Sequence, residues 1–157
     1  MTADVGPDFR AAMRRLAAGV GVVTAIGIDG PTGMAATSIT SLTVEPPSML
    51  VCVNRSAGLH AVLAPGARLC VNLLSCDQRE VAAAFGGAVA RELRFTLGSW
   101  SPDDHGIDRL EGAQANLSCV VEQMTAYGTH SIVIVRVDAV RLAGPVAPLI
   151  YQDGKYL

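Results

Sequence analysis

A chain of 157 residues is long enough for one domain with a sizeable core, and we expect residues 1–157 to form a single domain. Half of the residues are apolar, 17% are charged and the mean hydropathy is +0.38, so we expect a partner subunit to bury part of the apolar surface. A net charge of -2, a pI near 5.8 and few aromatic residues argue against an extended nucleic-acid interface.

Cysteine spacing and the N-terminus indicate the compartment. The 4 cysteines contain no CxxC pair and no Cys/His spacing suited to zinc, so we expect buried, reduced thiols and no metal site. Met1 to Arg10 lacks the basic and apolar regions of a signal peptide. No uncharged stretch reaches the ~18 apolar residues that a membrane span needs. We therefore expect a cytoplasmic protein with no membrane partner.

The N-terminal part is expected to begin with a helix and to continue as strands. Phe9 to Ala17 has the apolar spacing of a helix and follows Asp8, a favourable N-cap. Val20 to Ile28 is rich in Val, Ile and Thr and stops at Asp29-Gly30, a dipeptide favoured in tight hairpins. We expect two antiparallel strands to meet at that turn, with 33–38 on the returning strand.

The middle of the chain is expected to alternate strands with short helices. After the break at Pro46-Pro47, we expect a buried strand at 49–53, a short helix at 57–63 and a second buried strand at 68–74. Ser75 and Gln78 have the spacing of a capping box, which predicts a second helix that ends at Gly86-Gly87.

The last third is expected to hold a loop and two long strands. The loop, 91–108, has mixed polarity and short strand pieces, and the strands, 115–124 and 131–142, meet at Tyr127-Gly128. Several strands with a few short helices and no regular βαβ alternation predict a mainly β, barrel-like fold.

Two segments near the first strands could bind a ligand. Gly19 to Thr24 is similar to a dinucleotide fingerprint, but its sixth position is Thr24 and strand residues follow it, which argues against a Rossmann site. Thr37 to Ser41 contains four hydroxyl side chains, which fit either a polar strand end or the edge of a flat heterocycle such as isoalloxazine.

The segment Asn54 to Ser56 follows a strand and precedes a short helix. Ser56 is expected to cap that helix, whose free amides could attract a phosphate with Arg55 as counter-charge, although plain capping is the alternative. His60 could contact the phosphate or lie on the helix surface.

Two further histidines lie in turns. His130, at the mouth of a strand, could donate to a substrate or stack on a ring, or be solvated. His105 lies in an acidic loop without a cluster around it, and we expect it on the surface.

Taken together, several segments closely resemble, in order, the motifs of the short-chain flavin reductase family: 33–41, 44–47, 52–56, 70–74, Phe85-Gly86-Gly87, Gly128-Thr129-His130, 149–151 and 154–156. The resemblance extends from about Phe9 to Tyr156. It implies an FMN-binding split barrel with Greek-key topology, assembled as a homodimer with its flavin sites near the subunit interface. It also implies an NAD(P)H-dependent flavin reductase, which transfers hydride from NADH or NADPH to FMN or FAD and supplies reduced flavin to a flavin-dependent monooxygenase.

The resemblance assigns the following residues to flavin binding: Thr37, Ser38, Ile39, Cys52, Val53, Asn54, Ser56, His60 and Phe85. Thr37 and Ser38 would contact the polar edge of the ring, and Ser56 and His60 the phosphate. Cys52 is expected to pack and not to react, because the flavin carries the electrons. His130 would help to bind the nicotinamide nucleotide.

Two positions depart from the family pattern. Thr129 replaces the Asp common before the histidine, which removes a carboxylate that would orient His130. Leu59 stands where many relatives carry a hydroxyl residue before His60, which is expected to remove a phosphate contact.

Two other functions fit the same barrel. A flavin carrier or redox sensor would bind FMN without oxidising NADH, and the altered turn at Thr129 would suit it. An oxidase of the pyridoxamine-phosphate group would need a basic cluster, for which the sequence offers only Arg91 and Arg94.

Overall fold

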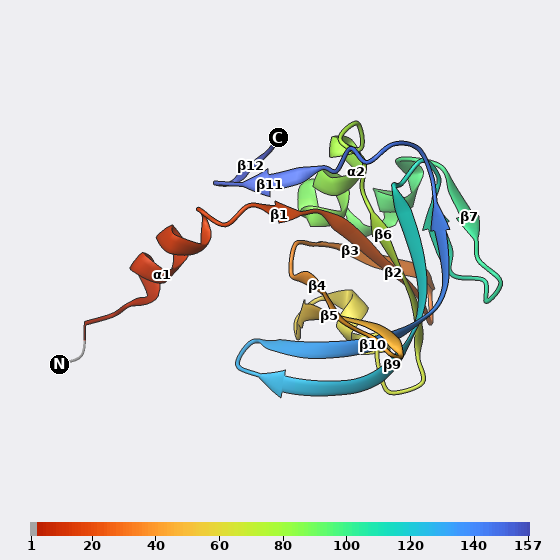
Figure 1. The fold of residues 1–157 in the computed structure, drawn as a ribbon, viewed down its shortest axis with the longest axis horizontal. Coiled ribbons are helices and arrows are strands. Elements are labelled where there is room, and N and C mark those ends of the chain that lie inside the picture. The colour runs from red at the N-terminus through yellow and green to blue at the C-terminus, as the bar shows by residue number, and fades with distance from the viewer. Residues whose placement is uncertain (1–2) are drawn as a thin grey trace.

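A computed structural model describes residues 3–157, which form strands with a few short helices around them (Figure 1). In chain order the elements are α1 (Gly6–Met13), β1 (Ala18–Gly19), β2 (Gly21–Gly27), β3 (Gly30–Ala36), β4 (Ile39–Val44), β5 (Pro47–Asn54), η1 (Gly58–Val62), β6 (Arg68–Leu73), α2 (Arg79–Ala83), η2 (Ala84–Ala88), η3 (Arg91–Thr96), β7 (Trp100–Pro102), β8 (Asp108–Leu110), β9 (Ala115–Tyr127), β10 (His130–Leu142), β11 (Ile150–Gln152) and β12 (Lys155–Tyr156).

The largest sheet has the strand order β3-β2-β6-β9-β10-β5-β4, with antiparallel neighbours throughout. Its two edge strands, β3 and β4, are joined by Thr37 and Ser38 alone, so the sheet must curl until its edges approach each other. No ladder pairs β3 with β4 among residues 3–157, and the barrel therefore stays split along this seam. The prediction of a mainly β barrel with short helices is confirmed.

Bulges let β9 and β10 reach around the barrel. Their pairing register shifts between Ile134 and Val135 and again between Val137 and Ala139. A bulge bends a strand and increases its twist, and both strands curve visibly in Figure 1. Their common turn therefore projects beyond the barrel, to the side where α1 lies.

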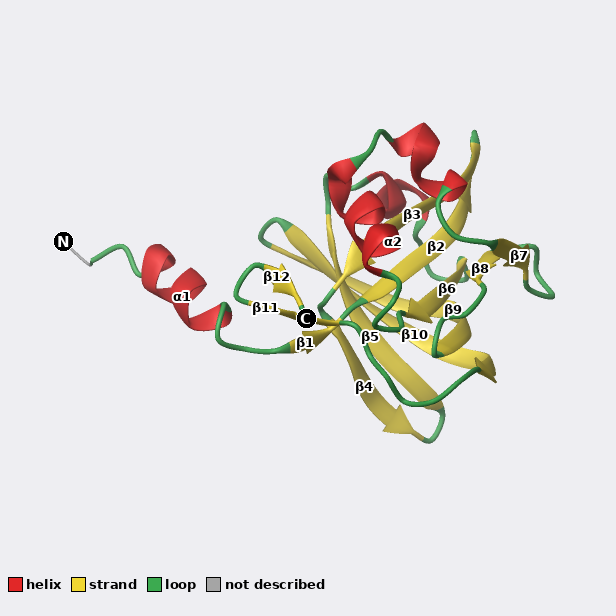
Figure 2. Cartoon of the chain, turned by 90° about the horizontal axis from the view of Figure 1, so that it is seen from above, coloured by secondary structure: helices red, strands yellow, loops and turns green. Residues whose placement is uncertain are grey.

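Two apolar clusters form the core, one on each face of β2. Val23, Val51 and Val133 fill the barrel interior, each at most 1% exposed. On the other face of β2, Val22 packs with Phe85 and Leu110. Figure 2 shows the helical segments around α2 gathered over β2 and β3. β2 is thus covered on both sides, which explains why its sequence is apolar without alternation.

No helix within residues 3–157 is both long enough and apolar enough to cross a membrane.

The predicted β2–β3 hairpin is confirmed, with its turn one residue earlier than expected. Gly27 pairs with Gly30, so Ile28 and Asp29 form the two-residue loop. Gly30, at the start of β3, has φ of 112°, a conformation that glycine adopts without steric cost. At Gly33, a Cβ would lie 2.9 Å from both the Phe85 ring and the Val23 carbonyl, so only glycine lets β3 pack this closely.

The N-terminal helix begins and ends earlier than the sequence predicts. It spans Gly6–Met13, and Asp8 lies in its first turn instead of capping it. Asp4 Oδ1 accepts a hydrogen bond from the Gly6 amide at 2.9 Å, and Pro7 suits the first turn because its missing N–H needs no partner. These local contacts start the helix before the predicted cap.

The second helix forms half of its predicted capping box. The Ser75 amide donates to Gln78 Oε1 at 3.0 Å, but the Ser75 hydroxyl bonds to Asp77. The helix α2 starts at Arg79, and the following turn η2 ends through Gly87 at φ 107°.

Two features of the chain's second half were not predicted. The expected loop 91–108 holds the predicted short strand pieces, β7 and the start of β8, but also the short helix η3, which was not predicted. Near the C-terminus, β11 pairs with β1, so Tyr151 lies opposite Ala18.

The four cysteines are free, as expected, but their burial differs. Cys70 and Cys119 are buried and Cys52 is half-buried. Cys76 is exposed, which corrects the expectation of a buried thiol: it lies just beyond β6, in the turn that leads to α2.

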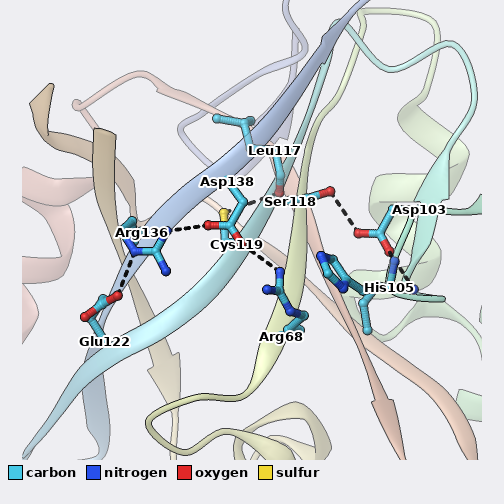
Figure 3. A network of polar contacts seen from close by, with 10 residues as sticks. Arg68, Asp103, His105, Leu117, Ser118, Cys119, Glu122, Arg136 and Asp138 are labelled. Atoms are coloured by element: carbon cyan, nitrogen blue, oxygen red, sulfur yellow. Dashed lines mark hydrogen bonds and ion pairs between the residues drawn. The ribbon is translucent and has the colours of Figure 1, made fainter. Parts of the chain in front are cut away.

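A polar network covers the outer face of β6, β9 and β10 (Figure 3). Asp138 accepts from Arg68 and Arg136, each at 2.7 Å. Beside them, Asp103 accepts from the Ser118 hydroxyl at 2.8 Å, which fastens the predicted loop to β9. Burial raises the pKa of Asp103, but the hydrogen bonds that it accepts outweigh this and hold the pKa below its usual range. His105, in the same loop, is exposed as expected.

Candidate functional site

Three segments meet at the adjacent strands β4, β5 and β10, and the third of them is far from the other two in the sequence. The Cys52 amide donates to the Ser38 carbonyl at 3.1 Å, which fixes the start of β4 against β5. On the other edge of β5, Asn54 pairs directly with His130. The Arg55 amide then donates to the Thr129 carbonyl at 2.9 Å. β5 thus brings the predicted ring-edge, phosphate and nicotinamide segments side by side.

One hollow, here the η1 hollow, lies beside the end of β5. It measures about 750 Å³ and is lined by Asn54, Arg55, Ser56, His60, Gly128 and Thr129. The Arg55 guanidinium donates to the Gly128 carbonyl at 3.3 Å, which keeps a cation at this hollow. An exposed guanidinium beside hydroxyl and amide groups suits a phosphate.

Ser56 does not cap η1, which corrects the sequence prediction. Asn54 Oδ1 accepts hydrogen bonds from the Ser56 amide at 2.9 Å and from its hydroxyl at 2.8 Å. The residue at the start of η1 is Ala57, which makes no side-chain cap. Ser56 bonds to Asn54 instead of capping the helix because the Asn54 side chain closes a local turn around Ser56 before the helix begins.

His60 is half-buried and bonded, so it is not simply a surface residue of its helix. Its Nε2 lies 2.9 Å from the Ser131 hydroxyl on β10. This contact fixes the imidazole while it still lines the η1 hollow. Leu59, by contrast, is 1% exposed and packs in the barrel core, so this departure from the family pattern leaves no gap in the hollow.

A second hollow, the α1 hollow, lies between the barrel and the N-terminal helix. It measures about 710 Å³ and is lined by Phe9, Arg10, Met13, Arg14, Leu16, Ala18, Thr37, Ser38, His130, Tyr151, Gln152, Asp153 and Gly154. Thr37 and Ser38 are exposed here, and neither hydroxyl has a hydrogen-bond partner within residues 3–157. They remain available to the edge of a polar ring.

The imidazole of His130 faces this same hollow and is exposed. Its Nδ1 lies 2.8 Å from the Thr129 hydroxyl. The residue that replaces the family's Asp therefore still holds the ring, through a neutral hydrogen bond.

The other predicted site residues lie in or near the core. Val53 and Phe85 are at most 2% exposed and line neither hollow. The Phe85 ring makes an edge contact with Phe95, with centroids 5.0 Å apart, behind β3. Cys52 is half-buried on β5, and Ile39 lines a separate apolar groove. These residues support the site from behind.

The sequence did not predict that α1 and the C-terminal hairpin β11–β12 line one side of the α1 hollow. Phe9 and Met13 have helical spacing, which predicts core packing, yet both are exposed beside His130. Tyr151 joins them only because β11 returns to pair with β1. No local signal in the sequence could indicate this placement.

The polar side chains around the two hollows are hydroxyls, amides, imidazoles, guanidinium groups and one carboxylate, and the α1 hollow adds apolar and aromatic side chains. No group of three or more His, Cys, Asp or Glu side chains suited to a metal occurs within the described 3–157. The set offers hydrogen bonds to a ring edge at one end and charge for a phosphate at the other. Such a set of groups is suited to a phosphorylated heterocycle and to a second reactant beside it.

Comparisons with known proteins agree with this chemistry. A family model described as flavin reductase like domain matches residues 13–157. The chain is 38% identical over 149 residues to FMN reductase (NADH) RutF of Variovorax paradoxus, covering 95% of this chain and 83% of that protein. It is also 38% identical over 154 residues to the reductase component of the FADH(2)-dependent resorcinol hydroxylase of Rhizobium sp., covering 97% and 86%.

A solved structure shares the fold. NADH:FAD oxidoreductase SgcE6 of Streptomyces globisporus, in complex with NAD and FAD fragments, matches with a TM-score of 0.86 and 27% identity. The match covers 96% of this chain and 90% of that one.

Proposed function

Because the chain belongs to the flavin reductase like domain family, we propose that it reduces FMN or FAD with NADH and supplies the reduced flavin to a separate flavin-dependent monooxygenase. The observation that carries this proposal is the meeting of three segments on β4, β5 and β10. Ser38, Asn54 and His130 thereby come within one stretch of surface, with a hollow on each side.

The residues present fit a flavin. The free hydroxyls of Thr37 and Ser38 can donate to the carbonyl and nitrogen edge of the isoalloxazine ring. Asn54 would lie beside the ring and the ribityl chain, with the half-buried Cys52 behind it on β5, and Ser56, His60 and Arg55 would face a phosphate in the η1 hollow. Val53 and Phe85 act from the core by holding β5 and β3 in place.

When bound, the flavin accepts a hydride at N5 from C4 of the nicotinamide. The chain's own task is to hold the two rings face to face, to exclude water and to stabilise negative charge at the ring edge. Thr37 and Ser38 can donate to that edge as charge develops. His130, fixed by Thr129, orients the nicotinamide nucleotide from the open side.

The proposal is tested by anaerobic mixing of the purified protein with NADH and either FMN or FAD, while the bleaching of the flavin absorbance is followed. Repeated turnover with excess flavin supports a reductase. Comparing the rates with FMN and FAD, and with NADH and NADPH, shows which flavin and which donor the protein prefers. Flavin binding without bleaching would instead identify a carrier or sensor. A coupled assay with a flavin-dependent monooxygenase tests whether reduced flavin is released.

A homodimer is part of the same proposal. An apolar groove of about 460 Å³ lies beside Ile39, between β4, β10 and the C-terminal segment. Around it, Val44, Leu142 and Val146 are 83%, 77% and 95% exposed. A second copy would remove this apolar surface from water. Light scattering of the purified chain gives the mass directly.

Two further predictions from the sequence accompany this proposal. We propose that residues 1–157 form one domain and that the protein is cytoplasmic.

A further inference from the structure

The N-terminal helix α1 presents an uncovered apolar face. None of its residues is buried, and Phe9, Met13 and the following Leu16 are 62%, 47% and 64% exposed. The spacing of four residues places Phe9 and Met13 on one side of the helix, and Leu16 follows in the turn after it. A helix of 8 residues is marginal in water without tertiary contacts. The exposed apolar side chains of α1 therefore need a ligand or another surface to pack against them.

The position of α1 is set by a clamp at its C-terminal end. Arg14 Nε pairs with Asp153 Oδ1 at 2.8 Å, and Arg14 Nη2 donates to the Asp153 carbonyl at 3.2 Å. The Asp153 amide in turn donates a hydrogen bond to the Arg14 carbonyl at 3.0 Å. Figures 1 and 2 both show α1 standing clear of the barrel beside the β11–β12 hairpin. The clamp keeps the helix there, as the outer wall of the α1 hollow.

The α1 hollow combines apolar and cationic surface opposite the ring-edge residues. Phe9 and Met13 form the apolar part, and Thr37, Ser38 and His130 lie on the barrel side. Arg10 also lines the hollow, and its guanidinium has no ion-pair partner within residues 3–157. A volume of about 710 Å³ falls in the ~300–1,000 Å³ range of ligand sites.

Resting on the proposed function, we infer that α1 is the donor-side wall of the site, with Phe9 packing on a ring of the nicotinamide dinucleotide and Arg10 pairing with its pyrophosphate. The candidate phosphate groups for the flavin lie in the η1 hollow, which shares no lining residue with the α1 hollow, although Asn54 from one and His130 from the other are paired. Face-to-face hydride transfer needs the second ring against the first, and α1 lines the same hollow as Thr37 and Ser38, which would hold the edge of the first ring. An apolar stripe beside a free cation complements two aromatic rings joined by a dianion.

The test uses the full chain and charge reversal on the helix. Arg10→Glu and Phe9→Ser are compared with Arg15→Glu, a matched control whose guanidinium donates to the Ala11 carbonyl at 2.5 Å and lies outside the α1 hollow. NADH is titrated into flavin-free protein and NAD⁺ into FMN-loaded protein, both as equilibrium binding. Affinity for FMN, KM for NADH, kcat and molar mass are measured alongside.

We expect Arg10→Glu to weaken nucleotide binding and to raise KM for NADH by about tenfold or more, because a charge-assisted contact becomes repulsive. Phe9→Ser should act in the same direction, while FMN affinity, kcat and the control stay within about twofold. Unchanged nucleotide affinity in both variants would overturn the inference. So would weakened FMN binding instead, loss of assembly with nucleotide affinity intact, or a wild type that binds neither nucleotide. A wild type that binds NAD⁺ but never bleaches flavin would refute the proposed function alone, because the titrations still decide the role of α1.

Discussion

The Thr129 hydroxyl oxygen lies 2.8 Å from Nδ1 of His130, at the tip of the β9–β10 hairpin. The side chain that replaces a carboxylate thus keeps the orienting contact and gives up the charge. Whichever partner donates, the bond restricts rotation of the imidazole and leaves Nε2 for a ligand in the α1 hollow. A neutral partner orients the ring without adding the basicity that a carboxylate would confer.

Removing this contact should impair the reaction without impairing the fold. We expect Thr129→Val to slow NADH-dependent flavin reduction about three- to tenfold, which corresponds to the loss of one hydrogen bond. Thr129→Ser should restore the rate, because the hydroxyl returns. Thr125→Val, on the exposed part of the same hairpin, is the control. Equal rates for the Val and Ser variants would show that the contact has no role.

His130 itself should matter more than its partner. We expect His130→Ala to slow single-turnover flavin reduction about ten- to hundredfold, because the nicotinamide loses a positioning group. Flavin affinity, measured by quenching of flavin fluorescence, should stay within about twofold. His105→Ala, which removes an exposed histidine from the distant Asp103 loop, is the matched control. An unchanged rate would remove His130 from the mechanism.

The η1 hollow should distinguish FMN from riboflavin, which lacks the phosphate. We expect Ser56→Glu to raise the Kd for FMN by about tenfold or more, since the carboxylate repels the phosphate and fills space beside Arg55. The Kd for riboflavin should change much less. Ala61→Glu places the same charge on an exposed position of η1, outside the hollow, as a control. Equal losses for both flavins would mean that this hollow does not hold the phosphate.

A buried amide joins four strands and should be critical for stability. Asn72, fully buried on β6, accepts from the Leu110 amide at 2.9 Å and from Asn116 at 2.8 Å, and donates to the Val22 carbonyl at 2.9 Å. Asn72→Leu leaves these groups unpaired and should lower the free energy of unfolding by about 3 kcal/mol. Gln123→Leu, an exposed amide on β9, should change it by less than about 0.5 kcal/mol. Urea denaturation of both variants makes the comparison.

Thiol reactivity should follow burial. Burial, with a smaller contribution from a neighbouring charge or thiol, raises the pKa of Cys70 and of Cys119 to about 12. Because the thiolate is the reactive form, both should resist iodoacetamide in the native protein, at pH 7 and at pH 9 alike. Exposed Cys76 should be alkylated readily. Peptide mass spectrometry before and after unfolding in urea reads each site, and native labelling of Cys70 at the rate of Cys76 would contradict the packing described.

Sequence alone determined the elements that depend on local chemistry. The β2–β3 hairpin follows from Asp29-Gly30: the loop itself is Ile28 and Asp29, and Gly30 starts β3 at a positive φ that glycine adopts at no steric cost. The strands around 49–53 and 68–74 follow from short β-branched, apolar runs between turn residues. The motif order also gave the family. Where two local contacts compete, as between Asp4 and Asp8 for the start of α1, the pattern could not rank them.

Only the tertiary structure decided which of these elements meet. That Asn54 faces His130 depends on the register of β5 against β10, which is set by packing across the barrel and not by neighbours in the chain. The same holds for α1: Phe9 has the spacing of a core residue, but the clamp between Arg14 and Asp153 holds it in the open, opposite His130. Long-range pairing selects among partners that local propensity leaves equivalent, and the site is made of such pairings.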